Sequence, residues 1–513
     1  MTTTQTDVAT SNKAYSELCS ILREIGNLHS IDALLNWDTE VLMPDGASKA
    51  RAEQTALIAG LKHERKTSSR FADLLAECES DADLANDPME GRNLREIRRD
   101  FDKATKLSTE LVSEISRVTS EGVMTWRDAR ASNDFEAFAP SLERIFELMR
   151  EKASAYGVPE GGELYDALFA DYEVGMRVSE VEAAFTPLRA WLKDFVREVR
   201  ENGTPIDESF RGISLPVDKQ VEFNRMLGER LGFDYSCGRL DVSTHPFSEP
   251  IGPGDIRMTT RYKEDAFLEG LLATMHETGH SLYEQQIDKW DRLGQPLAEA
   301  ISLGVHESQS RVIENQVGRS RAFWEWALPA MHEYFGDASR AFSVEQAWWA
   351  ANRVKPSFIR VEADETTYGL HIMMRFDIER LLVDGKLSVR DVPEWWNARM
   401  KEDFGVDVDC AANGCLQDIH WSAGYVGYFP TYYLGTLYSA QMWEVFLRDH
   451  PGAESEFAQG EFGSVVSWMG EHVHRHGRRD TTGEMLQRIC GEGLNPRPFQ
   501  EYLEAKIRGV YGL

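Results

Sequence analysis

The chain has 513 residues, of which 42% are hydrophobic, so it is long enough to bury a large core. A formal net charge of −29 and a sequence pI near 4.9 would repel a phosphate backbone, which excludes nucleic acid as an expected partner. No run of about 18 apolar residues occurs, and the start "MTTTQTDVATSNKAYSELCS" lacks the basic and apolar parts of a secretion signal. We therefore expect no membrane association and predict a cytoplasmic protein.

Taken in chain order, the periodicity predicts three portions of one unit that spans residues 1–513. From about residue 14 to residue 230, apolar residues recur at steps of three and four, as in "LREIRRDFDKATKLSTELVSEISRV", which is typical of amphipathic helices. Between about residues 231 and 262 the chain is rich in Pro, Gly, Ser and Thr, which predicts a small sheet. Helical periodicity then returns from about residue 263 to residue 513, with breaks at the turn-forming pairs "DG" (384–385) and "NG" (413–414). The expected fold is mainly α with a minor sheet.

The stretch "TMHETGH" (274–280) indicates a metal site. On a helix, His276 and His280 project from the same face one turn apart, so two imidazoles can hold one ion. Glu277 then lies beside the open coordination position, where it can accept a proton from the attacking water. Two histidines can fall at this spacing by chance, but the surrounding "AFLEGLLATMHETGHSLYEQQI" has a sustained apolar face. That face predicts a long, partly buried helix, which is typical of a catalytic metal helix.

A tetrahedral catalytic site needs a third protein ligand, and a carboxylate on a following helix supplies it in one major class of zinc peptidases. The candidate is Glu307 in "SLGVHESQSRVIENQ". Spacing alone leaves three alternatives open, namely Glu299, His306 and Glu314.

Six short motifs occur in order along the chain: "HPF" (245–247), "DIRMT" (255–259), "HETGH" (276–280), "HESQSR" (306–311), "IRVEAD" (359–364) and "GCLQDIHW" (414–421). In these motifs the sequence resembles the M32 metallocarboxypeptidases, the carboxypeptidase Taq family. The upstream segments "LLNWDTEVLMPDGASKARAEQ" and "YDALFADYEVGM" also look like family segments, so the resemblance covers most of the chain.

The resemblance implies a helical, two-lobed metallopeptidase fold with a deep cleft, a small β-sheet near the active site, and a homodimer. It implies zinc, with cobalt as an alternative, held by His276, His280 and Glu307, with Glu277 as the general base. The gap between His280 and Glu307 is about one residue longer than the family pattern, which a loop insertion around "DKWDRLGQ" would absorb.

The segment "DIHWSAGYVGYFPTYYLG" supplies candidate donors for the oxyanion that forms when water attacks a peptide carbonyl. His420, Tyr425 and Tyr432 have a spacing similar to that of the His and Tyr donors of the helical thimet-oligopeptidase-like relatives. We expect Tyr432 and His420 to donate, with Tyr425 as the next candidate. Aromatic residues at helical steps usually pack in a core, and this is the interpretation for Tyr428, Phe429 and Tyr433.

An exopeptidase must recognise a free carboxylate, and the planar fork of arginine suits this task. Arg360 is the leading candidate and Arg257 the second. The alternative for Arg360 is a structural ion pair with Glu362 or Asp364.

The remaining motif residues have weaker assignments. His245 and Phe247 of "HPF" are expected to line the substrate groove. Asp255 and Asp418 are equally well explained as residues that orient other site groups.

The pattern favours a metal-dependent carboxypeptidase that removes single residues from peptides with a free carboxyl end. An oligopeptidase that cuts inside short peptides would use the same metal helix and tyrosines. A binding protein with a structural metal is disfavoured, because a structural zinc has no need of Glu277 and normally has a fourth protein ligand.

Overall fold

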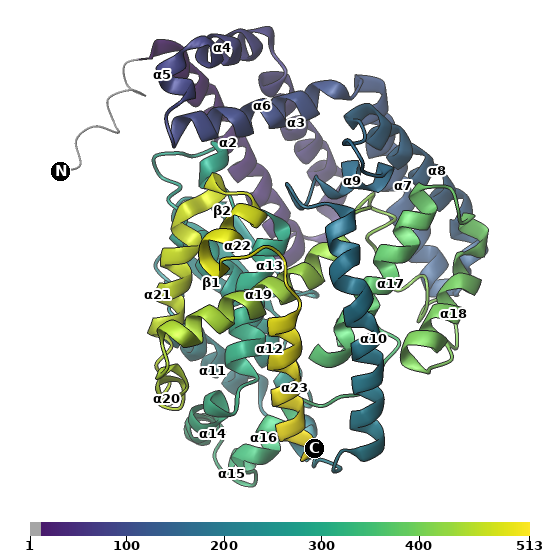
Figure 1. The fold of residues 1–513 in the computed structure, drawn as a ribbon, viewed down its shortest axis with the longest axis vertical. Coiled ribbons are helices and arrows are strands. Elements are labelled where there is room, and N and C mark those ends of the chain that lie inside the picture. The colour runs from purple at the N-terminus through teal and green to yellow at the C-terminus, as the bar shows by residue number, and fades with distance from the viewer. Residues whose placement is uncertain (1–11) are drawn as a thin grey trace, which may run out of the picture.

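The computed structural model describes residues 12–513, which are mostly helical and contain one small sheet (Figure 1). The prediction of a mainly α fold with a minor sheet is thereby confirmed. Residues 1–11, for which the sequence analysis expects no secretion signal, lie outside the described residues. Among the described residues, no helix is long and apolar enough to cross a membrane.

The amino-terminal portion is helical, as its periodicity predicts. Its example segment is two helices rather than one, because Ser108 accepts a hydrogen bond from the backbone N–H of Leu111 and starts a new helix. The elements of this portion are α2 (Lys13–Val41), η1 (Asp45–Ala47), α3 (Ser48–Lys66), α4 (Ser69–Ser80), α5 (Ala82–Ala85), α6 (Glu90–Lys106), α7 (Thr109–Ser132), α8 (Phe135–Tyr156), α9 (Leu164–Phe169), α10 (Val178–Asn202), η2 (Ser209–Gly212) and α11 (Val217–Arg230).

A three-stranded sheet occupies the region in which the composition changes. Its strands are β1 (Gly238–Val242), β2 (Ser248–Gly252) and β3 (Asp255–Thr260), in the order β1-β3-β2. β3 is central, pairing parallel with β1 and antiparallel with β2. Gly254 forms the tight β2–β3 turn with a left-handed φ of 76°, which glycine adopts without a steric penalty. β3 packs on the following helix α12, where the Thr260 hydroxyl donates to the carbonyl of Gly270.

Helices return after the sheet, and both predicted breaks fall outside them. α17 ends directly before the first, and the second lies in a long segment, residues 405–428, without helix or strand. The elements are α12 (Phe267–Gln286), η3 (Pro296–Ala298), α13 (Leu303–Arg311), η4 (Val312–Gly318), α14 (Arg321–Phe335), α15 (Asp337–Arg340), α16 (Val344–Ala351), η5 (Arg360–Glu362), α17 (Glu365–Val383), η6 (Val389–Asp391), α18 (Val392–Phe404), α19 (Phe429–Asp449), α20 (Ala453–Phe457), α21 (Gly463–His472), η7 (His474–Arg479), α22 (Thr482–Cys490) and α23 (Arg497–Tyr511).

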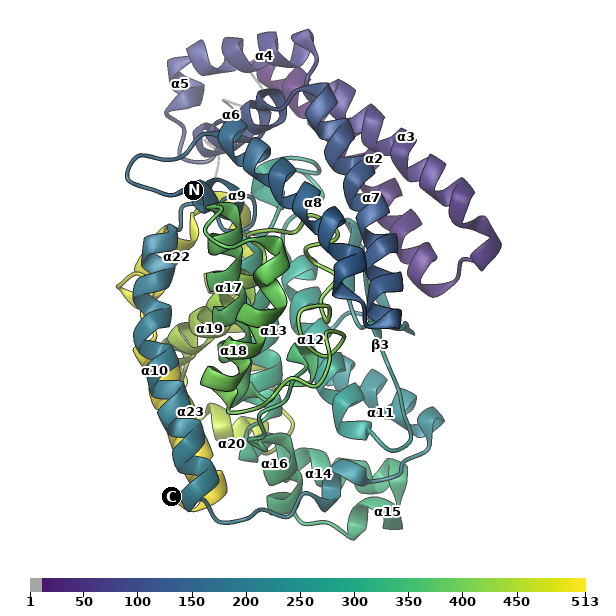
Figure 2. The same cartoon turned by 90° about the vertical axis from the view of Figure 1, so that its right-hand side faces the viewer.

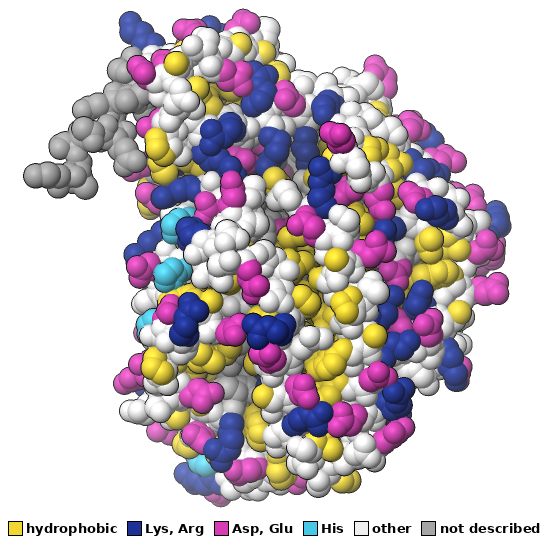
Figure 3. All heavy atoms as spheres, viewed as in Figure 1, with side chains coloured by type: hydrophobic (Ala, Val, Ile, Leu, Met, Phe, Trp, Pro, Cys, Tyr) yellow, Lys and Arg dark blue, Asp and Glu magenta, His cyan; other side chains and the backbone are white. Residues whose placement is uncertain are grey.

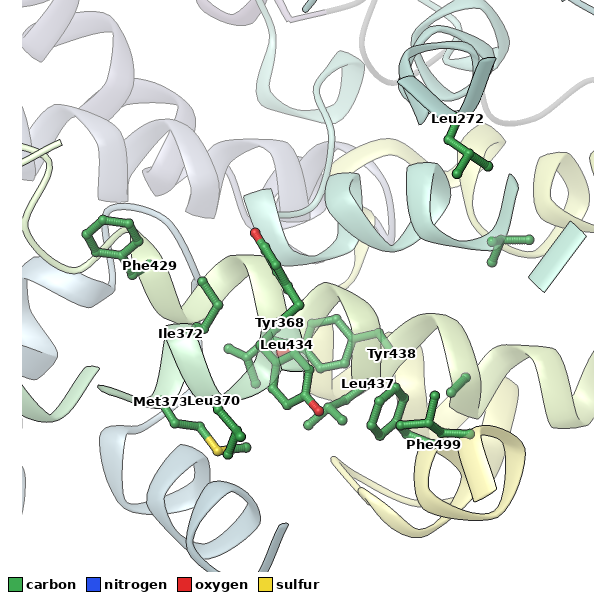
Figure 4. Close-up of a cluster of buried hydrophobic side chains, with 14 of the residues drawn as sticks. Leu272, Tyr368, Leu370, Ile372, Met373, Phe429, Leu434, Leu437, Tyr438 and Phe499 are labelled. Carbon is green, nitrogen blue, oxygen red and sulfur yellow. The ribbon is translucent and has the colours of Figure 1, made fainter. Parts of the chain in front are cut away.

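One extensive core joins the helices from α7 to α23, and smaller clusters lie under the amino-terminal helices. In the centre of the molecule, α12, α13 and α19 lie side by side (Figure 2). Figure 4 shows side chains of α17 and α19 packed together, including Tyr368, Leu434 and Leu437. Gly435 allows α19 to approach α13 closely, since a Cβ there would lie 2.6 Å from Cβ of Glu307.

The surface carries many ion pairs between neighbouring helices. Arg380 of α17, for example, pairs with Glu163 beside α9 and with Glu182 of α10. On the face drawn in Figure 3, acidic and basic side chains are interspersed, so no continuous basic surface covers that face.

Candidate metal centre

Two helices of the core bring three potential ligands together. α12 carries His276 and His280 one turn apart, and α13 carries Glu307. Two hydrogen bonds hold the first turn of α13. The Ser302 hydroxyl accepts one from the N–H of Val305, and the buried carboxyl of Glu173 accepts the other from the N–H of Gly304. These contacts place the α13 carboxylate against the α12 imidazoles.

The distances between the three side chains fit one metal ion. Nε2 of His276 lies 3.2 Å from Nε2 of His280, and Oε2 of Glu307 lies 3.7 Å and 3.4 Å from these two atoms. A tetrahedral zinc ion with bonds of about 2.0–2.1 Å separates its ligand atoms by about 3.3–3.4 Å. Among residues 12–513, no other group of three or more His, Cys, Asp and Glu residues has ligand atoms that all lie within 4.8 Å of one another. The donor set and its spacing therefore suit a zinc-like ion.

Glu314, one of the alternative ligands, lies on the other side of the His276 ring. Its Oε2 is 2.9 Å from Nδ1 of His276, and Arg311 and Arg319 hold it at 3.1 Å and 2.7 Å. A carboxylate at this nitrogen fixes the tautomer that leaves Nε2 free for a metal. Glu314 is part of η4, a π-helix that continues α13, and such segments are frequent at functional sites.

The other two alternatives also lie outside the group of three. Nδ1 of His306 is 2.6 Å from Nδ1 of His280, and Nε2 of His306 is 2.8 Å from the carboxylate of Glu284, which pairs with Lys289. His306 therefore stands behind His280 in the way that Glu314 stands behind His276. Glu299 is half-exposed and pairs with Arg478.

Burial and charge give Glu307 and His280 the protonation states that metal ligands need. Burial raises the pKa of Glu307, but Arg311 and His276 outweigh it and lower the pKa to about 2. Burial and the neighbouring His306 lower the pKa of His280 to about 3. At neutral pH the carboxylate is therefore ionised and the imidazole neutral.

Glu277 lies next to the group and has a different environment. Only 6% of it is exposed, and burial, followed by the charges of Glu307 and Glu314, raises its pKa to about 7 against the opposing effect of His276. A carboxyl whose pKa lies near neutrality exchanges a proton easily at neutral pH.

Arg360 is buried and pairs with Asp418, not with Glu362 or Asp364. Its Nε and Nη2 lie 3.0 Å and 2.9 Å from Oδ1 of Asp418, and its Nη1 donates to the Tyr368 hydroxyl at 3.3 Å. The expected alternative pairing is therefore wrong, since Asp364 instead caps α17. Arg375 reaches the other oxygen of Asp418 at 2.6 Å, so two guanidinium groups share one carboxylate.

Arg257 forms its ion pair with Asp255 of the same strand. Its Nε and Nη2 meet both oxygens of Asp255 at 2.8 Å and 2.7 Å, and its guanidinium lies 4.6 Å from the centre of the Trp37 ring. Phe247 packs in the same small cluster, between the sheet and α2, while His245 is exposed. The structure does not bring these three residues into the group that surrounds the metal ligands.

The aromatic segment brings two of its three predicted donors together. Nε2 of His420 lies 3.2 Å from the hydroxyl of Tyr432, whose ring lies 5.1 Å from the guanidinium carbon of Arg360. Burial and Arg360 lower the pKa of His420 to about 3, so its ring is neutral at neutral pH. Tyr425 is 49% exposed and stands outside this pair.

The core interpretation holds for two of the three remaining aromatic residues. Phe429 and Tyr433 are buried, as expected. For Tyr428 the interpretation is wrong, because it is only half-buried and lies with its ring 5.2 Å from that of Tyr432. Burial, and then the charge of Glu307, raise the pKa of Tyr428 to about 12.

Comparison with known proteins identifies the family. The model of the carboxypeptidase Taq (M32) metallopeptidases matches residues 17–507. The chain belongs to the M32 family. Thermostable carboxypeptidase 1 of Thermus thermophilus is 40% identical over 512 residues, which cover 98% of this chain and all of the relative, and Carboxypeptidase 1 of Bacillus subtilis is 34% identical over 96% and 98%. The M32 carboxypeptidase structure from Deinococcus radiodurans R1 is 37% identical with a TM-score of 0.94, covering 98% and 100% of the two chains.

Membership of the M32 family confirms the predicted fold class and the prediction of a hydrolase of the metallocarboxypeptidase class. It also confirms a metal-dependent enzyme, for which the group of His276, His280 and Glu307 is the candidate site.

Several residues of this M32 centre were not found from the sequence. Glu284 lies one helical turn after His280, so its position on the same face of α12 was visible in the spacing. Arg311 is the last residue of the motif "HESQSR", but the sequence indicated no role for it. Arg319 and Arg375 offered no local signal, because their partners come from other turns or other helices.

Proposed function

We propose that this chain is a zinc-dependent carboxypeptidase that releases single residues from peptides with a free carboxyl end, with cobalt as an alternative metal. His276, His280 and Glu307 would hold the ion. When bound, the ion supplies Lewis-acid polarisation of the peptide carbonyl and acidifies water. The relatives named carboxypeptidases, over nearly the whole chain length, support this proposal.

Glu277 is the proposed general base. Its carboxylate accepts a proton from the attacking water and passes it to the leaving amine. The raised pKa supports both steps, because a carboxyl that titrates near neutrality is neither too weak a base nor too weak an acid for them.

Tyr432 and His420 are the proposed donors to the oxyanion, and Tyr425 stays the next candidate. The Tyr432 hydroxyl donates directly, and the neutral His420 ring lies within hydrogen-bonding distance of it. Donors fixed before the reaction stabilise developing charge without reorganisation at the moment of reaction.

The observation that carries the exopeptidase assignment is the pairing of two arginines with one aspartate. Among the described residues, Asp418 is the single carboxylate that forms an ion pair with Arg360 or Arg375, so the buried group has an excess of positive charge. A substrate carboxylate beside Arg360 would balance that excess. Since Arg360 also lies over the Tyr432 ring, the terminal carboxylate would be bound next to the proposed oxyanion donor.

Two peptides that differ only at the carboxyl end, free acid against amide, test this assignment. The amide leaves the arginine partly unpaired, which costs on the order of 2–5 kcal/mol, so it should be cut very poorly. Arg360→Ala should lower activity on the acid and shrink the gap between acid and amide. Arg257→Ala is the matched control, because Arg257 has an aspartate of its own, Asp255, whereas Arg360 shares Asp418 with Arg375; the Arg257 variant should keep the gap.

The same pair of peptides separates the two peptidase functions. If the wild type cuts acid and amide equally well, and also cuts an internally quenched peptide inside its sequence, the protein is an oligopeptidase and the carboxypeptidase proposal is wrong. The homodimer and the cytoplasmic location stay predictions of the sequence analysis.

A further inference from the structure

The loop of residues 405–428 carries two of the candidate donors, His420 and Tyr425, yet has no helix or strand of its own. No regular backbone ladder therefore fixes its shape. Donors must lie within a few tenths of an ångström of their working positions to be effective. Side chains of neighbouring helices must therefore hold this loop.

α17 holds the loop on both sides of His420. Arg375 donates from Nε to Asp418 at 2.7 Å, two residues before the histidine. Glu379 is one turn further along the same face of α17, and its Oε1 accepts from the indole Nε1 of Trp421 at 2.8 Å, one residue after it. Two anchors four residues apart on one helix thus enclose the histidine.

Glu379 makes more contacts than this one. Its Oε2 accepts from the backbone N–H of Gly427 at 3.1 Å and from the Tyr165 hydroxyl of α9 at 2.5 Å. Three donors from the loop and from α9 therefore meet one fully buried carboxyl. The backbone at Gly427 also packs closely against α9, because a Cβ there would lie 3.0 Å from the backbone nitrogen of Phe169. Its φ of 95° is a second reason for glycine at this position.

We propose that Glu379 is a positioning residue that keeps His420 within hydrogen-bonding distance of the Tyr432 hydroxyl by fixing Trp421 and Gly427. Glu379 lies in none of the six family motifs and needs no contact with substrate for this role. The inference rests on the proposed function of His420 as a donor.

Glu379→Gln tests the proposal with a change of one atom. All three partners are donors, so the amide NH2 must face a donor where the carboxylate oxygen accepted one. We expect kcat to fall about tenfold, as for a catalytic group displaced by a fraction of an ångström, with KM and bound metal unchanged. Glu90→Gln is the matched control, because Glu90 is also buried and also accepts from a tyrosine, Tyr15, but in the amino-terminal helices; it should keep wild-type kcat.

A double-mutant cycle separates positioning from general destabilisation. If Glu379 acts through His420, then Glu379→Gln in a His420→Ala background should lower kcat by less than about twofold, since the group that it positions is absent. An undiminished tenfold loss in that background would overturn the proposal. Should Glu379→Gln fail to fold, Trp421→Phe removes one donor and keeps an aromatic ring, and the same cycle applies to it.

Hydrogen exchange gives a readout that does not depend on activity. In Glu379→Gln, amides of residues 414–428 should exchange faster, while those of α12 keep their wild-type rates. Unchanged exchange in the loop would overturn the anchoring role of Glu379. A loosened loop, together with full activity of His420→Ala, would instead contradict the proposed donor function of His420 and leave the anchoring contacts supported.

Discussion

Nδ1 of His276 lies 2.9 Å from Oε2 of Glu314, while Nε2 of the same ring faces Oε2 of Glu307 at 3.7 Å. One imidazole thus stands between two glutamates of successive helical segments, and only Glu307 is on the side of His280. The two carboxylates should therefore respond differently to the same substitution.

Glu307→Gln should remove most of the bound metal, because it takes charge and a strong donor atom directly from the ion. Glu314→Gln should weaken metal binding by about 10–100-fold, since the ligand ring stays and loses only its orienting carboxylate. Metal content after dialysis against a graded chelator measures both. Equal occupancy in the two variants would assign the third ligand to another residue.

Removal of the metal should abolish peptide hydrolysis, and adding zinc or cobalt back should restore it. The chelated sample should keep its helical circular dichroism spectrum, because buried hydrophobic residues such as Met275 of α12 and Val305 of α13 tie the ligand helices to the large core without the ion. Full activity in a sample with no measurable metal would contradict the metal centre.

Glu277→Gln should keep its metal and lower kcat by at least about a hundredfold, the usual scale for loss of a general base. The amide preserves the shape of the side chain and cannot accept the proton. The measurement is kcat with metal content on the same preparation. A parallel loss of metal would show that Glu277 acts as a ligand or a structural residue.

Tyr432→Phe should lower kcat with little change in KM, because the missing hydroxyl serves a charge that forms late in the reaction. Tyr425→Phe tests the next candidate: since Tyr425 is 49% exposed and lies outside the pair of Tyr432 and His420, its kcat should fall less, and a larger fall than in Tyr432→Phe would make Tyr425 the donor. A rise in KM alone for Tyr432→Phe would assign the hydroxyl to substrate binding.

Glu173 predicts a dependence of stability on pH. Burial raises the pKa of its carboxyl from 4.5 to about 7 in the folded protein, against several hydrogen bonds that lower it. Between these values the folded state keeps a proton that the unfolded state releases, so the contribution of Glu173 to stability falls as pH rises, by up to about 1.4 kcal/mol per pH unit.

Urea unfolding of wild type and Glu173→Gln at several pH values measures this contribution. The difference in the free energy of unfolding, wild type minus variant, should decrease from pH 5 to pH 7 and be constant above it. A difference that does not vary with pH would mean that the folded and unfolded states bind this proton equally.

The sequence predicts this centre well where the information is local. The four-residue step between His276 and His280 places both on one face of a helix, whatever surrounds it. The pairing of Arg360 with Asp418 joins residues 58 positions apart, and periodicity says nothing about such contacts. The nearby acids Glu362 and Asp364 looked like partners because distance along the chain was the only available guide.

Tyr428 also shows that local sequence does not reveal contacts between distant parts of the chain. Its place in a run of aromatic residues at helical steps indicated a core residue, but the preceding loop leaves it only partly buried. The path of a loop without regular structure depends on anchors such as Glu379, which lie on a distant helix.

Because η4 is a π-helix, the number of residues in this segment determines where Glu314 lies relative to His276. Its backbone bonds run from each residue to the fifth one along, so loss of one residue would let the segment return to α-helical pairing. Glu314 would then rotate away from His276, although no ligand had changed. A loop absorbs changes of length more readily than a helix, so among relatives we expect insertions between His280 and Glu307 and none between Glu307 and Arg319.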